Sequence, residues 1–554
     1  MKKNLSIVIL LISLAISQSV FSQTYSFEKG KVPEGWKIDK GVLHISSEKY
    51  KSGSRSLQIK WKQNAVLTLP SPTGISEACR NRNGGMNAWI YNESPTKENL
   101  LFSFRDETGK EVCQLPFLLD FKGWRCIWAK FQGDMNMSSK SNIQSVEIQF
   151  PQHTKKGVTY IDLLEFTSKV SWQNMSDAQY KVNRTDYSLI PDFIGYRNAT
   201  PKVEKVITAE DNQITTITNR LTTWYLGSGQ HSSERWIKMR TENEKTFIRN
   251  GVKAAQKIKI QYTEDHTPQG EPLFPMGAPT IIDGQEAKKF RSINENILLP
   301  LALDYRKNQN DQSLKKALYI YDWFNDQGWA DGSSMGTLCF EKLRSSGYFH
   351  SFFLLKEQLS SEQLKRELQT MNWFTMFGAC YQLPSHAGEV ADNLRALAIP
   401  KLIYALSQND KQEREVALTA FKHYMDNALG IAPGFFGTFK ADFSGYHHRG
   451  PYHSAYYPHA LYAGALIAYL LHDTPYALSE TTLHNLKQGL LTFRFFCAGL
   501  EVPAGTVGRF PKGQQILETL LPAFAYTALS FKEPDKELTA AFKRILESTE
   551  NQQA

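Results

Sequence analysis

The sequence predicts a multidomain α+β protein in which an antiparallel β-sandwich is followed by an α/α toroid of antiparallel helical hairpins. Three observations lead to this prediction. The chain has 554 residues, enough for roughly two to four domains. Its first third is rich in short segments typical of strands, whereas the remainder shows apolar residues at helical spacing.

Residues 24–170 contain short strand-like segments, punctuated by Gly, Pro, Asn and Ser at intervals of about ten residues. Segments such as Gly41–Ile45 and Val146–Phe150 alternate apolar and polar residues or contain β-branched runs. Even spacing of this kind is typical of an antiparallel sandwich, so we predict a carbohydrate-binding-like domain. Residues 171–211 are polar and irregular and are predicted to form a linker.

Residues 212–554 are predicted to form the toroid. No repeat of fixed length is visible in this region, which disfavours a solenoid and favours a closed toroid. The long loops of a toroid gather at one end, where a cleft forms. The predicted helices are 212–227, 233–262, 295–308, 312–328, 361–381, 390–408, 411–429, 459–472, 481–498, 515–530 and 535–550.

The N-terminus has the layout of a secretory signal peptide, predicted over residues 1–22. Lys2 and Lys3 precede the apolar run Leu5–Ile16, and small residues end near Ser22. The apolar run is shorter than a bilayer requires, and no later stretch is long and apolar enough to span one. We therefore expect a secreted or periplasmic protein with no membrane partner.

The formal net charge is +9 and is spread along the chain without polybasic blocks. Such an excess suits a polyanionic ligand in a groove, although it also serves simply to keep a surface soluble. No zinc finger, helix-turn-helix or RNA-binding signature is visible, so nucleic acid is not the expected polyanion. The chain is expected to act as a monomer.

The segment Tyr446–Tyr457 concentrates titratable side chains directly before an apolar helical run. It holds three imidazoles, four phenols and one arginine, and Gly450 and Pro451 prevent a continuous helix there. Packing in a helix core does not require so many imidazoles, whereas proton transfer does require titratable groups of this kind. We predict that this loop is the centre of an active site.

Three further elements are predicted to line the same cleft. Asn393 lies in the motif Asp392–Arg395 at a helix start, where it could instead cap the helix. Arg509 lies between glycines that permit close approach of a ligand. The third element is a set of three tryptophans, which are either sugar-stacking platforms or core residues: Trp323, Trp329 and Trp373.

An amide, an imidazole, a phenol and a guanidinium on separate loops of one cleft favour β-elimination on a uronic acid. A neutral amide or a cation beside the uronate carboxylate lets negative charge build into an enolate-like intermediate. A base then removes the C5 proton and an acid protonates the departing glycosidic oxygen. A phenol beside an arginine can serve in both steps. The reaction requires no cofactor. Whether the sandwich domain binds a structural calcium ion stays open.

At these residues the chain resembles polysaccharide lyase family 8, and most of all its chondroitin ABC lyase branch. The segment Ser26–Leu57 looks like the N-terminal jelly roll of that branch, and Phe439–Pro475 looks like its catalytic core. Family members place the catalytic His seven to nine residues before the catalytic Tyr. Here His448 is eight residues before Tyr456, and His447 is nine before it.

The resemblance implies roles for single residues. Tyr456 is the acid and also serves as a base, and His448 is a base or a partner of the substrate carboxylate. Arg509 supports Tyr456, and Asn393 neutralises the carboxylate. The further substrate-binding residues are expected to be His447, Tyr457, Trp323, Trp329 and Trp373, with His447 as the alternative catalytic imidazole and Tyr457 as the alternative phenol.

Two departures from the family shape the expected substrate and activity. The segment Gly332–Cys339 lacks the histidine pair that the branch uses for iduronate. Chondroitin sulfate is therefore the main expected substrate, hyaluronan a further one, and dermatan sulfate less expected. The sequence stops at Ala554, before the C-terminal β-sandwich domains of family members. Either it is a fragment or the enzyme works without them, and lower activity or stability is expected.

Two other functions stay open at this point. A toroidal glycoside hydrolase would need a pair of carboxylates, for which Asp392, Asp442 and Glu501 are available. A non-catalytic glycan-binding protein with a truncated catalytic half would bind the same acidic polysaccharide without turnover.

Overall fold

The computed structural model describes residues 24–171, 177–181, 193–228, 235–262, 267–274, 281–282, 285–286, 288–335, 342–508 and 516–553. The chain divides into two compact units. The sandwich unit comprises residues 1–190, 260–289 and 322–338, and the helical unit comprises 191–259, 290–321 and 339–554. The predicted signal peptide, residues 1–22, lies outside the described residues.

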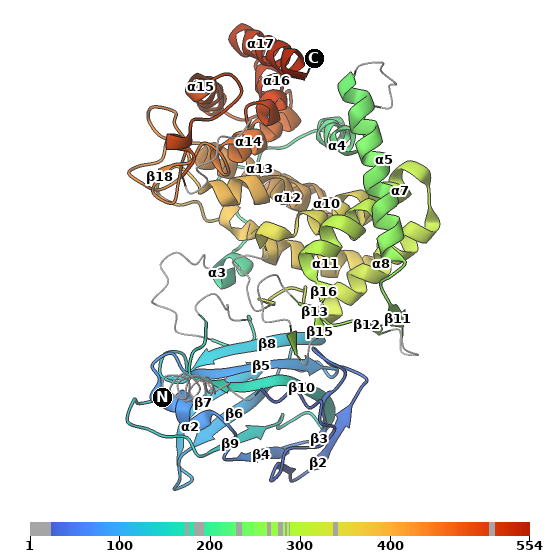
Figure 1. The fold of residues 1–554 in the computed structure, drawn as a ribbon, viewed down its shortest axis with the longest axis vertical. Coiled ribbons are helices and arrows are strands. Elements are labelled where there is room, and N and C mark those ends of the chain that lie inside the picture. The colour runs from blue at the N-terminus through green and yellow to red at the C-terminus, as the bar shows by residue number, and fades with distance from the viewer. Residues whose placement is uncertain are drawn as a thin grey trace, which may run out of the picture. The chain divides into compact units, whose positions relative to one another are not determined.

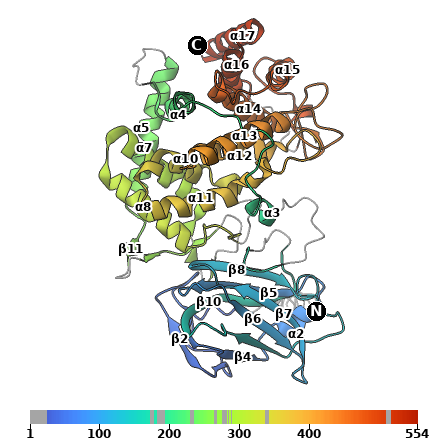
Figure 2. The same ribbon diagram turned by 180° about the vertical axis from the view of Figure 1, so that it is seen from behind.

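The sandwich unit consists of two five-stranded sheets in which every pairing is antiparallel (Figures 1 and 2). One sheet has the strand order β1 (Lys37–Ile38), β4 (Val66–Pro70), β9 (Ser145–Gln149), β6 (Asn99–Arg105) and β7 (Glu111–Leu118). The other has the order β2 (Gly41–Ser46), β3 (Ser56–Lys62), β10 (Lys156–Thr167), β5 (Gly85–Asn92) and β8 (Gly123–Lys130). Alternate residues of these strands pack between the sheets, including Ile59, Phe102 and Ile148, as a sandwich requires. The predicted β-sandwich is confirmed.

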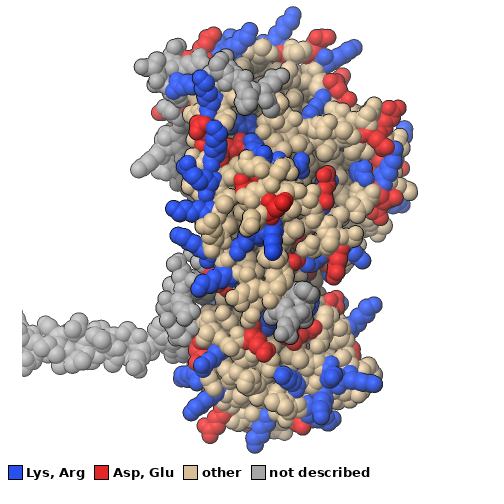
Figure 3. All heavy atoms as spheres, turned by 90° about the vertical axis from the view of Figure 1, so that its right-hand side faces the viewer, with Lys and Arg blue, Asp and Glu red and all other residues tan. Residues whose placement is uncertain are grey.

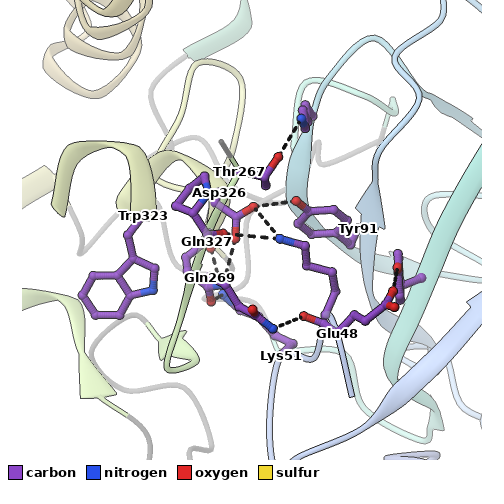
Figure 4. A network of polar contacts seen from close by, with 12 residues as sticks. Glu48, Lys51, Tyr91, Thr267, Gln269, Trp323, Asp326 and Gln327 are labelled. Carbon is purple, nitrogen blue, oxygen red and sulfur yellow. Dashed lines mark hydrogen bonds and ion pairs between the residues drawn. The ribbon is translucent and has the colours of Figure 1, made fainter. Parts of the chain in front are cut away.

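Residues 260–289 and 322–338 group with the sandwich, so the predicted boundary at residue 212 does not separate the two units. Figure 4 shows why. The buried Lys51 ammonium donates to the main-chain carbonyls of Leu273 at 2.7 Å and Gln327 at 2.8 Å. The Tyr91 hydroxyl donates to Asp326 Oδ1 at 2.6 Å. Short elements here are β11 (Ile260–Tyr262), β12 (Pro268–Gly270), β13 (Leu273–Phe274), β14 (Ile281–Ile282), β15 (Gln285–Glu286) and β16 (Lys288–Lys289), while α2 (Ile75–Arg80) lies earlier in the sandwich unit.

In the helical unit some consecutive helices pack on one another, as expected for helical hairpins, and others pack on the next helix but one (Figure 1). The helices are α3 (Phe193–Arg197), α4 (Asp211–Leu226), α5 (Arg235–Ala255), α6 (Phe290–Ile293), α7 (Leu299–Asn308), α8 (Asp311–Asp326), α10 (Ser346–Leu355), α11 (Ser361–Thr375), α12 (Ala391–Leu406), α13 (Lys411–Ala428), α14 (Tyr457–Leu471), α15 (Glu480–Phe496), α16 (Leu521–Leu529) and α17 (Lys536–Gln553). The last residues of α8 belong to the sandwich unit. The predicted fold class, antiparallel sheets followed by a helical region, is confirmed.

Four helices were not predicted, namely α2, α3, α6 and α10, and of these α2 and α6 span only six and four residues. α10 is buried along almost its whole length, so its sequence shows no polar face and no helical period. α3 lies inside the predicted linker, and its Phe193 ring packs against Trp373 of α11 at 5.8 Å. None of the helices within the described ranges combines the length and the apolarity that crossing a membrane requires.

Charged side chains of both signs are interspersed over the face drawn in Figure 3, with a row of Lys and Arg along one edge of the helical unit. On α5, Lys245, Arg249 and Lys253 follow one another at single-turn spacing and are exposed. The positive excess is thus distributed over the surface and is not confined to one segment of the sequence.

Candidate active site

A tight hairpin carries the two adjacent histidines. Strands β17 (Tyr446–His447) and β18 (Gly450–Pro451) pair antiparallel, which leaves His448 and Arg449 as a two-residue turn. Both turn residues are left-handed, with φ of 49° and 66°. Turns of this kind usually contain Asn-Gly, because a Cβ atom in the left-handed region costs about 1 kcal/mol per residue. Both turn side chains are exposed.

The side chain of Tyr456 lies at the centre of an aromatic cluster. Tyr456 is the N-cap residue of α14, and its ring stacks on His447 with centroids 3.9 Å apart and planes 20° apart. The rings of Tyr452 and His448 meet it edge-on at 4.9 Å and 5.7 Å. Only 7% of Tyr456 is exposed. The structure thus brings the predicted phenol and both predicted imidazoles together.

The first turn of α12 lies against this cluster, and α12 packs beside α14 (Figure 1). Asp392 Oδ2 lies 3.5 Å from His447 Nε2. Arg395 donates from Nε and Nη2 to Asp392 Oδ1 at 2.8 Å and 2.7 Å, and its guanidinium lies 5.5 Å from the Tyr456 ring centroid. Arg395 therefore places positive charge beside the phenol.

The Asn393 amide is held by Glu389. Asn393 Nδ2 donates to Glu389 Oε1 at 3.2 Å, and the same oxygen accepts the main-chain N–H of Val390 at 2.7 Å. The Tyr424 hydroxyl donates to Glu389 Oε2 at 3.0 Å. Burial first, and then the charge of Glu389, raise the pKa of Tyr424 well above its usual range. The N-cap of α12 is Val390, so Asn393 does not cap the helix.

Tyr457 and His453 have structural roles. The Tyr457 hydroxyl donates to Phe443 O at 2.7 Å, and the residue is 0% exposed. A Cβ at Gly445 would lie 1.8 Å from the Tyr457 ring, so this buried position depends on glycine. His453 Nε2 accepts the Gly445 N–H at 3.3 Å, and burial lowers the His453 pKa to about 4. The predicted substrate-binding role of Tyr457 is therefore wrong, since its ring and hydroxyl face the core.

The segment before Arg509 packs on the same loop. Thr506 O accepts the His453 N–H at 2.9 Å, and Val507 O accepts from Ser454 Oγ at 3.2 Å. At Gly508 a Cβ would lie 2.3 Å from the Tyr452 ring, so only glycine fits there. Arg509 itself lies outside the described residues.

The three tryptophans are core residues. Trp373 is 1% exposed, whereas Trp323 and Trp329 are 0% exposed and belong to the sandwich unit. Trp323 Nε1 donates to Glu271 O at 3.0 Å. A ring with no accessible face cannot stack on a sugar, so the predicted stacking role of these residues is wrong. Within the described ranges no group of three His, Cys, Asp or Glu side chains is arranged to hold a metal ion.

Sequence reasoning assigned no role to Arg395, Glu389 and Tyr452. One signal was available for Arg395: it stands three positions after Asp392 at a helix start, the spacing at which opposite charges meet on one helix face. Nothing in the sequence marks Glu389 as the partner of the Asn393 amide.

Both parts of the chain match family models of lyases. Residues 200–552 match the family model described as "Lyase, catalytic", and residues 21–182 match "Lyase, N terminal". A chondroitin sulfate ABC exolyase from Bacteroides thetaiotaomicron is 26% identical over 95% of this chain and 53% of its own length. A chondroitin sulfate ABC endolyase from Proteus vulgaris is 24% identical over 96% and 55%, respectively. The chain thus spans about half the length of the curated relatives it matches.

Among solved structures, a Paenibacillus xanthan lyase aligns with 60% of this chain and 31% of its own, at a TM-score of 0.46 and 12% identity. A Streptomyces coelicolor A3 chondroitin AC lyase in complex with chondroitin sulphate covers 60% of this chain and 44% of its own, at 0.45 and 12%.

Proposed function

The chain belongs to polysaccharide lyase family 8, and from that premise we propose that it cleaves chondroitin sulfate-type glycosaminoglycans by β-elimination at uronic acid. One observation carries the proposal. The Tyr456 phenol is packed between imidazoles and a guanidinium, next to the helix turn that presents the Asn393 amide. The names of the curated relatives, chondroitin sulfate ABC lyases, support this substrate class.

The first step of the proposed reaction is recognition of the uronate carboxylate. Glu389 accepts one N–H of the Asn393 amide. This hydrogen bond fixes the plane of the amide and therefore the direction of the second N–H on the same nitrogen. We assign that second N–H to the substrate carboxylate. A neutral donor there favours the enolate-like intermediate, because negative charge moves onto the carboxylate as the C5–H bond breaks.

The second step is the elimination. The base takes the C5 proton, the C5–H electron pair becomes the C4–C5 double bond, and the C4–O bond breaks toward the leaving sugar. Tyr456 gives its proton to the departing oxygen and serves as the base in its phenolate form, while Arg395 stabilises the negative charge on the phenol oxygen.

The two adjacent histidines take different roles in this proposal. His447 is 9% exposed, stacks flat on Tyr456 and faces Asp392, which suits a residue that positions the phenol. His448 is exposed at the hairpin turn, which suits a residue that reaches the substrate as a base or carboxylate partner. The left-handed backbone of the turn is the kind of local strain that proteins keep at functional sites.

The finer features of the function are also proposed. We expect a secreted or periplasmic monomer that needs no cofactor and acts mainly on glucuronate-containing chains, with hyaluronan as a second substrate. The hydrolase alternative receives no support from Asp392 and Asp442, two of the three carboxylates considered for it. Asp392 is paired with Arg395, and the hydrogen bond from Ser444 lowers the pKa of Asp442, whereas a hydrolase acid needs a raised pKa.

Incubation with chondroitin sulfate, hyaluronan and dermatan sulfate separately, followed by product absorbance, tests the proposal. A lyase produces unsaturated uronates that absorb in the ultraviolet. New reducing ends without absorbance would identify a hydrolase, and binding without any cleavage would identify a glycan-binding protein.

A further inference from the structure

Nearly all aromatic side chains within the described ranges are buried or half-buried, and three phenylalanines are the exceptions. Phe435 is 70% exposed, Phe436 is 42% exposed and Phe495 is 85% exposed. All three belong to the helical unit, on segments that contact the Tyr446–Tyr457 loop. Exposed phenyl rings on segments that contact the same loop are typical of a binding surface.

Phe435 and Phe436 occupy the tip of a turn anchored beside the Asn393 amide. The Phe436 ring meets His386 at 4.4 Å, and Lys440 Nζ donates to the Phe436 and Gly434 carbonyls. Thr438 Oγ1 donates to Glu389 O at 2.7 Å, and Thr438 O accepts the Tyr446 N–H at 2.9 Å. The turn is therefore fixed at its base both to the residue that holds Asn393 and to the strand that enters the histidine hairpin.

Phe495 adjoins the loop through its neighbour. Phe496 stacks on His453 with centroids 4.9 Å apart and planes 23° apart, at the end of α15. Phe495 is directed outward next to this contact and is the most exposed of the large hydrophobic side chains in the described part of the chain.

We propose that Phe435, Phe436 and Phe495 form a sugar-stacking platform for the units of an acidic polysaccharide that flank the bond to be cleaved. This inference rests on the proposed function and extends its site. A pyranose ring has an apolar face of C–H groups besides its charged edges, and a phenyl ring covers such a face without competing for the carboxylate or sulfate. The buried tryptophans cannot take this role. The platform contributes affinity, while Asn393, His448 and Tyr456 contribute chemistry.

Steady-state kinetics on chondroitin sulfate tests the platform. F435A, F436A and F495A are each expected to raise KM about threefold to tenfold with kcat unchanged, because stacking is uniform binding that is equal in ground state and transition state. F435W is expected to keep the original KM, and F435L, which is apolar but has no flat face, is expected to behave like F435A. L529A is the matched control: Leu529 is 45% exposed in the same unit, and its removal is expected to leave KM unchanged.

Two results would overturn the platform: an unchanged KM in the alanine variants, or an F435L that performs as well as F435W, which would indicate a general apolar cover for another protein surface. If the unmodified chain produces no unsaturated uronate, the proposed function fails first. Calorimetric binding of chondroitin sulfate oligosaccharides to the same variants then decides the platform by itself. Weaker binding by the alanine variants supports it, and no difference, or no binding by the unmodified chain, rejects it.

Discussion

Two regions of the molecule place a cation over an aromatic ring, and they use it differently. In the sandwich unit, Lys51 Nζ lies 4.3 Å from the Trp89 ring centroid and donates hydrogen bonds to two main-chain carbonyls. In the helical unit, the Arg395 guanidinium lies 5.5 Å from the Tyr456 ring centroid, and about a third of the Arg395 side chain is exposed.

The difference shows that a shifted pKa does not by itself locate the chemistry. Burial lowers the pKa of Lys51 to about 7, a value typical of lysines that act as bases. Yet Lys51 is wholly enclosed and its donors are satisfied by carbonyls, so it ties two chain segments to the sheet (Figure 4). The site in the helical unit is recognised instead by a buried phenol and imidazole beside a left-handed turn whose two side chains, His448 and Arg449, are exposed.

The largest expected effect is that of Tyr456→Phe. If the helical cluster performs the chemistry, loss of the hydroxyl removes the proposed acid and lowers kcat at least 10³-fold, within the range typical of a general acid–base group. The thermal midpoint should stay close to that of the unmodified chain, because the stacked ring is kept. Full activity in this variant would disprove the proposed mechanism, and Tyr462→Phe in the same helix is the control.

Arg395→Gln is expected to lower kcat/KM about 100-fold, the usual cost of losing one stabilising group at a developing charge. Arg395→Lys should recover only part of the loss, since an ammonium cannot reproduce the two-nitrogen contact with Asp392. If the lysine variant has full activity, the guanidinium contributes only charge, and the comparison with Lys51 becomes closer.

Lys51→Met tests the structural member of the comparison. Removing the ammonium leaves the Leu273 and Gln327 carbonyls buried without this donor, at a cost of about 2 kcal/mol in the free energy of unfolding at pH 7. Lys60→Met, an exposed lysine of β3, should cost almost nothing. Denaturant unfolding measures both variants.

The same variant has a defined pH dependence. The Lys51 pKa is about 7 in the folded chain and near 10.5 in the unfolded chain, so between these values the unfolded chain binds more protons. Lys51 therefore makes the stability of the unmodified chain rise with pH across this window. The difference in stability between the unmodified chain and Lys51→Met should consequently be larger at pH 9 than at pH 7. A difference that shrinks with pH would contradict the lowered pKa.

The sequence predicted the main architecture because that depends on local pattern, which strands and amphipathic helices carry in themselves. The sequence did not reveal α10, because this helix is buried on nearly all sides and its residues therefore show no helical period. In the site, the concentration of imidazoles and phenols at Tyr446–Tyr457 identified the loop without any tertiary information. Roles that depend on exposure could not be predicted: three tryptophans are enclosed, while Phe435 is 70% exposed.

The hairpin turn offers the smallest predicted effect, and it isolates backbone strain from side-chain chemistry. Arg449→Gly and Arg449→Ala remove the same side chain, but only glycine adopts φ of 66° without steric cost. The glycine variant should therefore be more stable than the alanine variant by about 1 kcal/mol in denaturant unfolding. Equal stabilities would mean that the turn relaxes and stores no strain. The glycine variant could also loosen the hairpin and so have a lower kcat than the alanine variant. That result would mean that the left-handed backbone holds His448 in place. Lys51 needs no such strain, because its hydrogen bonds already fix its position.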